Sequence, residues 1–241
     1  MTNGGGSDVV GHFQAGWEAL RRYPMLIVPP LAVHVLGVLL LLLWGGAIGM
    51  GALMGAMMGG SGGAAAGGIM AALAGGVLLW LSAVLVSLIA WGVVIVMARD
   101  ALAGREPMIG DAVGAVAGRL VDVVVASILK MIIVGIGLLL FAVPGVIAGF
   151  FLIFTLPAVL LDGQRATDGL KRSFHVVKGN PGPVVGFLVG AILVGVAAFI
   201  AAWIAHIVPF LGSLAAAVIF AAGVSYLIVV GVRLYQALPR A

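Results

Sequence analysis

The stretch MLIVPPLAVHVLGVLLLLLWGGAI, from Met25 to Ile48, contains no Asp, Glu, Lys or Arg. It belongs to a longer uncharged run that covers residues 23–98. A helix needs only about 20 apolar residues to cross the ~30 Å hydrocarbon core of a membrane. We therefore expect two membrane crossings in this run, over residues 25–48 and 69–98, with a segment rich in Gly, Ala and Met between them.

The composition of the whole chain excludes a water-soluble globule. Of the 241 residues, 63% are hydrophobic and 8% are charged, whereas an ordinary soluble domain has roughly 25% charged residues. Cysteine is absent, so neither a disulfide framework nor a thiolate metal site can form. Residues 1–15 carry no Lys or Arg, which a cleavable signal peptide would need. We expect the first apolar run to be retained as a membrane span.

Four further apolar runs pair into hairpins. We expect spans over residues 121–142, 146–161, 184–205 and 211–232. The first two are separated by Val143, Pro144 and Gly145, and the last two by residues 206–210, which include the helix breaker Pro209. The sequence thus predicts an all-α fold, in which residues 1–241 form a single membrane domain with six transmembrane helices arranged as three hairpins.

The basic residues predict the orientation of these hairpins. On the six-span scheme, the chain ends and the segments between hairpins hold eleven Lys and Arg residues, and the turns within hairpins hold none. The eleven are Arg21, Arg22, Arg99, Arg105, Arg119, Arg165, Lys171, Arg172, Lys178, Arg233 and Arg240. Because basic residues collect on the cytoplasmic side, we predict a multi-pass protein of the cell inner membrane with both termini in the cytoplasm. Apolar runs separate these residues, so they form no basic stripe and we expect no nucleic acid partner.

An amphipathic stretch precedes each hairpin. Residues 8–22 and 166–178 place apolar and polar side chains on opposite faces of a helix, and residues 111–120 show a weaker version of the same pattern. Asp111 is suited to cap the N-terminus of the middle helix, and Gly179 is suited to end the last one. We expect three cytoplasmic surface helices, each followed by a hairpin.

One group of residues carries a resemblance to known proteins. It consists of Phe13, Trp17, Arg22, Pro24, Pro29, the turn Val143-Pro144-Gly145, and the run LPAVLLDGQRATDGLKRSFHVVKGN from Leu156 to Asn180. These residues resemble a widespread family of six-helix prokaryotic membrane proteins, which includes uncharacterised integral membrane proteins and the membrane domain fused to some glycerophosphoryl diester phosphodiesterases. The long Gly and Met segment departs from that family. The resemblance implies the six-helix fold over most of the chain. It implies neither phosphodiesterase activity nor catalytic residues, because we expect no soluble domain here.

The segment between the first two spans has two interpretations. Five of its glycines recur every four residues: Gly51, Gly55, Gly59, Gly63 and Gly67. In a helix this spacing gives one face of small residues on which a second helix can pack closely. The alternative is a flexible outer loop, because Gly is a poor helix former.

The same segment holds the one candidate for a metal site. It contains four methionines: Met50, Met54, Met57 and Met58. Thioethers at such spacing can bind Cu(I), but the segment has no Cys, His or carboxylate to help. We expect these side chains to provide adaptable apolar packing instead.

Two titratable residues lie deep within the predicted spans, and together they form a candidate intramembrane polar site. For His34 we expect a polar partner in the helix bundle, the alternatives being a proton path or ligation of a haem or chlorin. For Lys130, one interpretation is a long stem that snorkels toward the interface. The other is a buried lysine that lines a polar path or forms an ion pair.

The sequence predicts a non-catalytic protein with no cofactor. It has no nucleophile elbow, no H-E-x-x-H motif and no P-loop, and no acidic pair falls within the apolar interior. We expect a scaffold or accessory subunit that organises lipids or a larger membrane complex, with another membrane protein or a second copy as partner. The alternative is a transporter for a small solute or ion, which would use His34, Lys130 and the nearby helix breakers Pro29 and Pro30.

Five basic residues of the surface helices are the candidates for binding: Arg21, Arg22, Lys171, Arg172 and Lys178. A basic side chain near an anionic leaflet contributes on the order of 1 kcal/mol to membrane binding. We expect these residues to bind anionic lipid headgroups, or an acidic partner, at the cytoplasmic face, with the apolar stripe of each helix at the acyl boundary.

Overall fold

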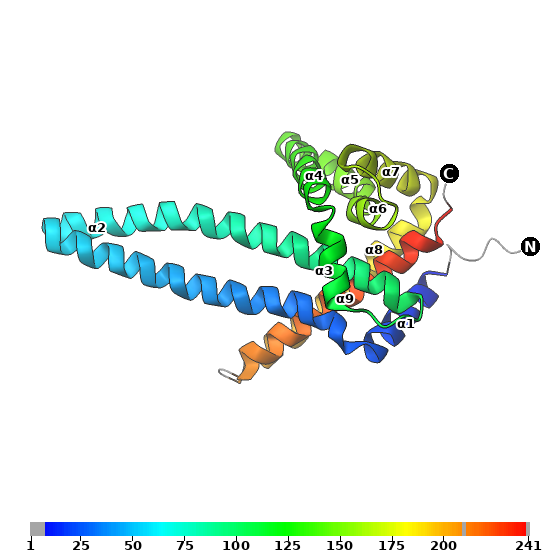
Figure 1. The fold of residues 1–241 in the computed structure, drawn as a ribbon, viewed down its shortest axis with the longest axis horizontal. Coiled ribbons are helices and arrows are strands. Elements are labelled where there is room, and N and C mark those ends of the chain that lie inside the picture. Colours follow the sequence, from blue (N-terminus) through cyan, green and yellow to red (C-terminus); the bar gives the residue numbers. More distant parts are fainter. Residues whose placement is uncertain (1–7, 209–210, 240–241) are drawn as a thin grey trace, which may run out of the picture. The chain divides into compact units, whose positions relative to one another are not determined.

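The computed structural model describes residues 8–208 and 211–239, and within these ranges every element of regular structure is helical. The elements in chain order (Figure 1) are α1 (Val9–Arg22), the 3₁₀-helix η1 (Pro24–Ile27), α2 (Val28–Leu102), α3 (Ile109–Ala117), α4 (Leu120–Leu140), α5 (Ala142–Phe151), α6 (Thr155–Leu161), α7 (Ala166–Gly179), α8 (Pro181–Ala205) and α9 (Leu211–Ala237). The expected all-α class is confirmed. Pro209 and Phe210 of the expected last turn, and Arg240, lie outside the described residues.

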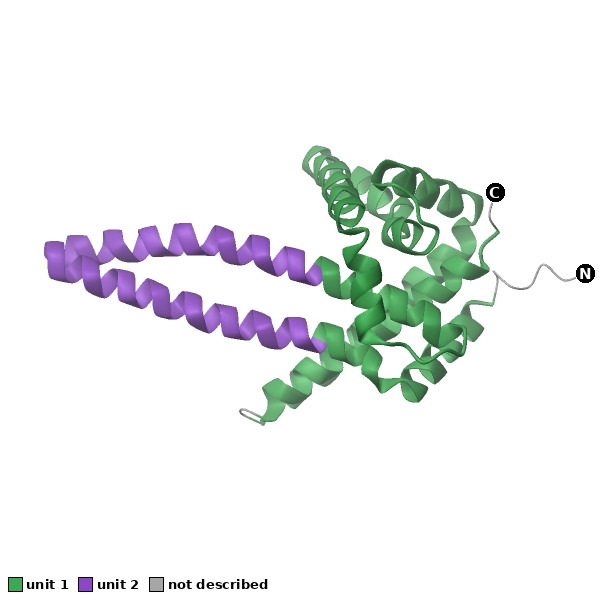
Figure 2. Cartoon of the chain, viewed as in Figure 1, with its two compact units in different colours: residues 1–30, 88–241 green, residues 31–87 purple. Residues whose placement is uncertain are grey.

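The chain forms two compact units, which are coloured separately in Figure 2. Unit 1 contains residues 1–30 and 88–241, and unit 2 contains Leu31–Ser87. Helix α2 contributes to both units.

Unit 2 is a helical hairpin whose two arms meet at glycines. The chain reverses at Gly59 and Gly60, where the backbone angles are not helical. The φ of Gly60 is +63°, a value that favours glycine. A Cβ atom on Gly51 would lie 2.8 Å from the carbonyl oxygen of Gly67, and one on Gly55 would overlap the carbonyl oxygen of Gly63. The segment is therefore helical and closely packed, not a flexible loop, although Gly59 forms the turn.

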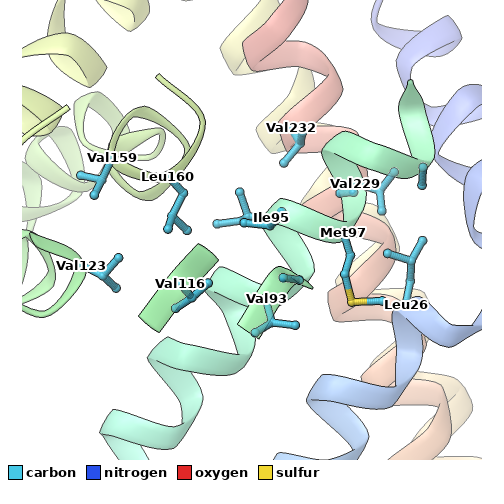
Figure 3. Close-up of a cluster of buried hydrophobic side chains, with 14 of the residues drawn as sticks. Leu26, Val93, Ile95, Met97, Val116, Val123, Val159, Leu160, Val229 and Val232 are labelled. Carbon is cyan, nitrogen blue, oxygen red and sulfur yellow. The ribbon is translucent and has the colours of Figure 1, made fainter. Parts of the chain in front are cut away.

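The core of unit 1 joins six elements through branched and flexible aliphatic side chains. Six of these side chains have no exposed surface: Leu26 of η1, Met97 of α2, Val116 of α3, Val123 of α4, Val159 of α6 and Val229 of α9. Figure 3 shows Met97 beside Leu26, with Val229 close to both. Such interlocked packing fixes each element in one position.

Helix α1 is held on α9 by hydrogen bonds between distant parts of the sequence. The Asp8 side chain caps the start of α1 by accepting from the Gly11 N–H at 2.8 Å. The Tyr226 hydroxyl then donates to the Phe13 carbonyl at 3.0 Å. Ser225, one residue earlier on α9, donates to the Leu26 carbonyl at 2.7 Å. The last two bonds attach α1 and η1 to α9 within unit 1.

The turn between α4 and α5 differs from the expected one. A single residue, Phe141, has extended backbone angles (φ −161°, ψ 147°) and reverses the chain. Val143, Pro144 and Gly145 already belong to the first turns of α5, where proline is tolerated because its missing N–H would have no helical partner. Gly145 serves packing instead, since a Cβ atom there would overlap Leu138 of α4.

Of two expected helix boundaries, the N-cap at Asp111 is wrong and the end of α7 at Gly179 is confirmed. Met108 is the N-cap of α3, and Asp111 lies inside the first turn. Gly179 is the last residue of α7, which Asn180 caps by donating from its side-chain amide to the Val176 carbonyl at 3.0 Å.

Several helices are apolar and long enough to cross a membrane. By length and composition these are η1 with α2, then α4, α5 with α6, α8 and α9. Large apolar side chains on them are exposed, among them Leu42 (67%), Leu139 (88%) and Trp203 (71%). An apolar surface of this extent is typical of a protein covered by lipid.

Candidate functional site

The fourth apolar run is broken in the middle, although its sequence contains no breaker at that point. Helix α5 ends at Phe151 and α6 begins at Thr155, and Leu152 and Phe154 between them have non-helical backbone angles. Ser173, which comes from α7 and is fully buried, bridges this gap. Its hydroxyl donates to the Phe151 carbonyl at 2.8 Å and accepts from the Phe154 N–H at 3.0 Å. One side chain therefore satisfies two backbone groups that the break releases.

A polar cluster lies at the other end of α6. The Asp162 carboxylate accepts a hydrogen bond from the Tyr235 hydroxyl at 2.5 Å and forms an ion pair with Arg172, Nε to Oδ2, at 3.5 Å. The carboxylate and the guanidinium are only 11% and 21% exposed. These residues tie α6, α7 and α9 together. Asp162 and Arg172, with Leu161, Gln164 and Asp168, also line an open hollow of about 690 Å³.

The connection between α6 and α7 is held from α4. Asp122 Oδ1 accepts a hydrogen bond from the Ala166 N–H at 3.2 Å, where α7 begins. Gly163 in the same connection has a φ of +69°. A Cβ atom on Gly163 would also lie 2.9 Å from Nη2 of Arg119, so only glycine fits there without strain.

An apolar pocket of about 320 Å³ lies within unit 1 beside the α5–α6 break. Its walls come from α2, α4, the break itself, α6, α8 and α9. Lys130, which is partly buried, is the only residue of its lining with an ionisable side chain. In the part of the chain that the structure describes, Lys130 has neither a hydrogen bond nor an ion pair. The pocket therefore combines apolar walls with one cation.

The structure separates Arg172 from the other predicted binding residues. Arg21, Arg22, Lys171 and Lys178 are exposed, whereas Arg172 points into the polar cluster with Asp162. Most of the apolar stripe of α7 is buried, including Ala166, Leu170 and Val177, and the helix packs on α4, α5, α6 and α8. The expected position of that stripe at the acyl boundary is therefore wrong.

The two residues of the candidate intramembrane polar site belong to different units. His34 lies exposed on the first arm of unit 2, and Lys130 lines the pocket of unit 1. The methionines are also exposed on unit 2: Met50 (59%), Met54 (59%), Met57 (82%) and Met58 (89%). In residues 8–208 and 211–239, no group of three or more His, Asp or Glu side chains is placed to hold a metal ion.

Sequence reasoning missed the helix break, the role of Tyr235 and the pocket. Ser173 and Asp162 were noticeable as polar residues within the distinctive run from Leu156 to Asn180. The Phe154 N–H that binds Ser173 and the Tyr235 hydroxyl that binds Asp162 are 19 and 73 residues away in the sequence, so no local pattern predicts these contacts. Tyr235 follows the predicted sixth span and resembles an ordinary interfacial aromatic residue.

Together these features define the class: an all-α protein with several apolar helices long enough to cross a membrane. The chain belongs to the family DUF7847, a domain of unknown function, which matches residues 107–238. No curated protein and no solved structure matches the chain. The matched region contains α3 to α9, and with them the break, the polar cluster and Lys130. The resemblance to the membrane domain of glycerophosphoryl diester phosphodiesterases stays a prediction.

Proposed function

We propose that this protein is a non-catalytic scaffold or accessory subunit of the inner membrane that organises lipids or a larger complex. The two arms of α2, α4 with α5–α6, and α8 with α9 would form three membrane hairpins. Helices α1, α3 and α7 and both termini would then lie on the cytoplasmic side. The distribution of Lys and Arg in the sequence supports this orientation.

The observation that carries the proposal is a shared surface feature of α1 and α7. On α1, Trp17 is 54% exposed and the exposed Arg21 and Arg22 follow one turn later. On α7, Phe174 is 40% exposed and the Lys178 ammonium lies 6.0 Å from the centre of its ring. An exposed aromatic ring beside exposed cations is typical of a helix at the membrane interface.

Four basic side chains are available for anionic headgroups. Lys171 is 74% exposed and its ammonium is paired with the half-exposed Asp168 side chain, at 3.7 Å, a contact that water weakens strongly. Arg172 is left out because it holds the polar cluster together. At about 1 kcal/mol each, the four together give a membrane contact of useful strength.

The test is to change these four residues and measure the bound lipid. A variant with Arg21→Gln, Arg22→Gln, Lys171→Gln and Lys178→Gln keeps Arg172 and therefore the polar cluster. After gentle purification it should retain several-fold less anionic phospholipid, or less of an acidic partner, with an unchanged unfolding midpoint. The matched control, Glu18→Gln with Asp168→Asn, removes exposed acidic groups from the same two helices and should retain as much anionic lipid or more.

Transport is the second candidate, and one observation favours it. A broken helix beside an unpaired lysine resembles the way transporters build substrate sites near mid-membrane. The apolar lining of that pocket argues against a hydrated path. If the four-residue variant retains all of its lipid and partners but loses uptake or efflux of a solute in cells, the scaffold proposal fails and transport replaces it.

A further inference from the structure

Lys130 differs from three cations of unit 1 that are held by carboxylates. Arg99 and Arg105 are both paired with Asp100, at 3.1 and 2.5 Å, and Arg172 is paired with Asp162. Lys130 has no such partner in the described residues, and the nearest acid before it on α4, Asp122, accepts from the Ala166 N–H instead. Arg119, which is also partly buried, has no such partner in the described residues either, but it lies at the N-cap of α4 and not within the helix. Intramembrane cations normally pair with an anion or with backbone carbonyls. We therefore expect the Lys130 ammonium to pair with an anion that does not belong to this chain.

The depth of Lys130 strengthens this requirement. It lies ten residues after Leu120, the first residue of α4, and a helix rises 1.5 Å per residue. The Cα atom is thus roughly 15 Å from the start of the helix, about half the thickness of the hydrocarbon core. A bound anion would offset the cost of an ammonium group at that depth.

The pocket that Lys130 lines is suited to an alkyl chain. Its other walls include Phe154 at the helix break, Phe187 of α8, Ile228 and Gly231 of α9, and Trp91 of α2. A volume of about 320 Å³ is at the lower end of the range for small-ligand sites, about 300–1,000 Å³. This volume fits one chain better than the two chains of a phospholipid.

We propose that this pocket binds a single-chain amphiphile with a carboxylate head, such as a fatty acid, with the carboxylate on the Lys130 ammonium and the chain against the apolar walls. The charge of Lys130 selects the head group, because a carboxylate supplies the missing counter-ion. The apolar walls select the tail. This site is distinct from the basic surface of α1 and α7. The proposal rests on the membrane placement of α4 in the proposed function, but not on lipid binding by α1 and α7.

Trp91 provides a direct reporter of occupancy, because it lines the pocket. The full-length protein is placed in neutral phosphatidylcholine nanodiscs and titrated at pH 8 with 11-bromoundecanoate, whose bromine quenches tryptophan fluorescence. The neutral probe is 11-bromoundecanol. A Trp91→Phe variant gives the quenching of the other tryptophans, and subtraction leaves the signal of Trp91.

We expect saturable quenching of Trp91 by the carboxylate at a concentration at least tenfold lower than for the alcohol. Lys130→Met should remove this tenfold preference, and Lys130→Arg should keep it. Arg233→Met, which removes an exposed basic residue on α9, is the matched control and should bind like the parent protein. Equal affinity for the acid and the alcohol in the parent protein, or an undiminished preference in Lys130→Met, would overturn the proposal.

A second pair of variants decides the question if Lys130→Met does not fold. Gly231→Leu places a side chain in the pocket, where Phe187 lies 3.4 Å from the Cβ position and limits retreat. Gly195→Leu adds the same side chain on α8, where nothing lies within 4 Å of the Cβ position. Gly231→Leu should abolish the saturable quenching and Gly195→Leu should preserve it. Saturable quenching that persists in Gly231→Leu would show that the amphiphile binds elsewhere.

Discussion

Replacing Ser173 by alanine removes one oxygen atom from the interior of unit 1. That oxygen bridges the break between α5 and α6, because it binds the Phe151 carbonyl and the Phe154 N–H at once. Ser173 has no exposed surface, and Phe154 is 2% exposed. In Ser173→Ala the buried Phe154 N–H and the partly buried Phe151 carbonyl would therefore both lose their partner.

The expected cost follows from these two groups. A buried polar group left without a hydrogen bond costs about 1–3 kcal/mol. Allowing for some relaxation of the break, we expect Ser173→Ala to lower the free energy of unfolding by about 2–4 kcal/mol. For a chain of this size, that corresponds to a fall in the unfolding midpoint of about 4–16 °C.

The assay is thermal unfolding of the purified protein in one fixed detergent, followed by circular dichroism. Ser127→Ala is the matched control. The Ser127 hydroxyl donates to the Val123 carbonyl four residues back at 2.7 Å, a carbonyl that also accepts the helical N–H bond. The control should therefore change the stability by less than about 0.5 kcal/mol. If Ser173→Ala unfolds at the same temperature as Ser127→Ala, the bridging role of Ser173 is refuted.

Two further predictions use the same assay. Tyr235→Phe removes the hydrogen bond to the Asp162 carboxylate and should cost about 1.5–3 kcal/mol. The double variant Tyr235→Phe with Asp162→Asn should lose less free energy of unfolding than the sum of the losses in the two single variants. Losses that add exactly would mean that the two side chains are not coupled. Gly55→Ala should destabilise the protein because its Cβ atom would overlap the Gly63 carbonyl oxygen. Gly62→Ala meets open space and should be neutral or stabilising, so equal effects of the two alanines would contradict the close packing of unit 2.

The apolar helices could be predicted because the membrane demands long uncharged runs, and such runs are local features of the sequence. The segment from Met25 to Ile48 is an example, because its lack of charged residues is enough to predict an apolar helix. The surface helices could be predicted for a similar reason, since residues 8–22 and 166–178 alternate between faces with a helical period. The many glycines of this segment left both a turn and close helix packing open. Which glycines form the turn and which lie in the helix contact is decided by the packing of the two arms, and the sequence alone does not show it.

The candidate sites could not be predicted, because they depend on contacts between distant residues. The run FFLIFTL, from Phe150 to Leu156, has no Gly or Pro, and its break is stabilised by Ser173 from α7. The sequence predicts the turn between α4 and α5 at Val143, Pro144 and Gly145, but proline is also suited to a first helical turn. The environment of Lys130 is set by five other segments, which no pattern on α4 reveals.

The measurement that tests the central claim most directly is the accessibility of single cysteines in intact cells, since the natural chain has none. Cysteines at the exposed positions Ser61, Pro144 and His206 should react with a membrane-impermeant thiol reagent added from outside. Cysteines at the exposed positions Arg105 and Lys171 should react only after the membrane is permeabilised. Labelling of Arg105 or Lys171 in intact cells, or protection of Ser61, Pro144 and His206 until permeabilisation, would contradict six crossings with both termini in the cytoplasm.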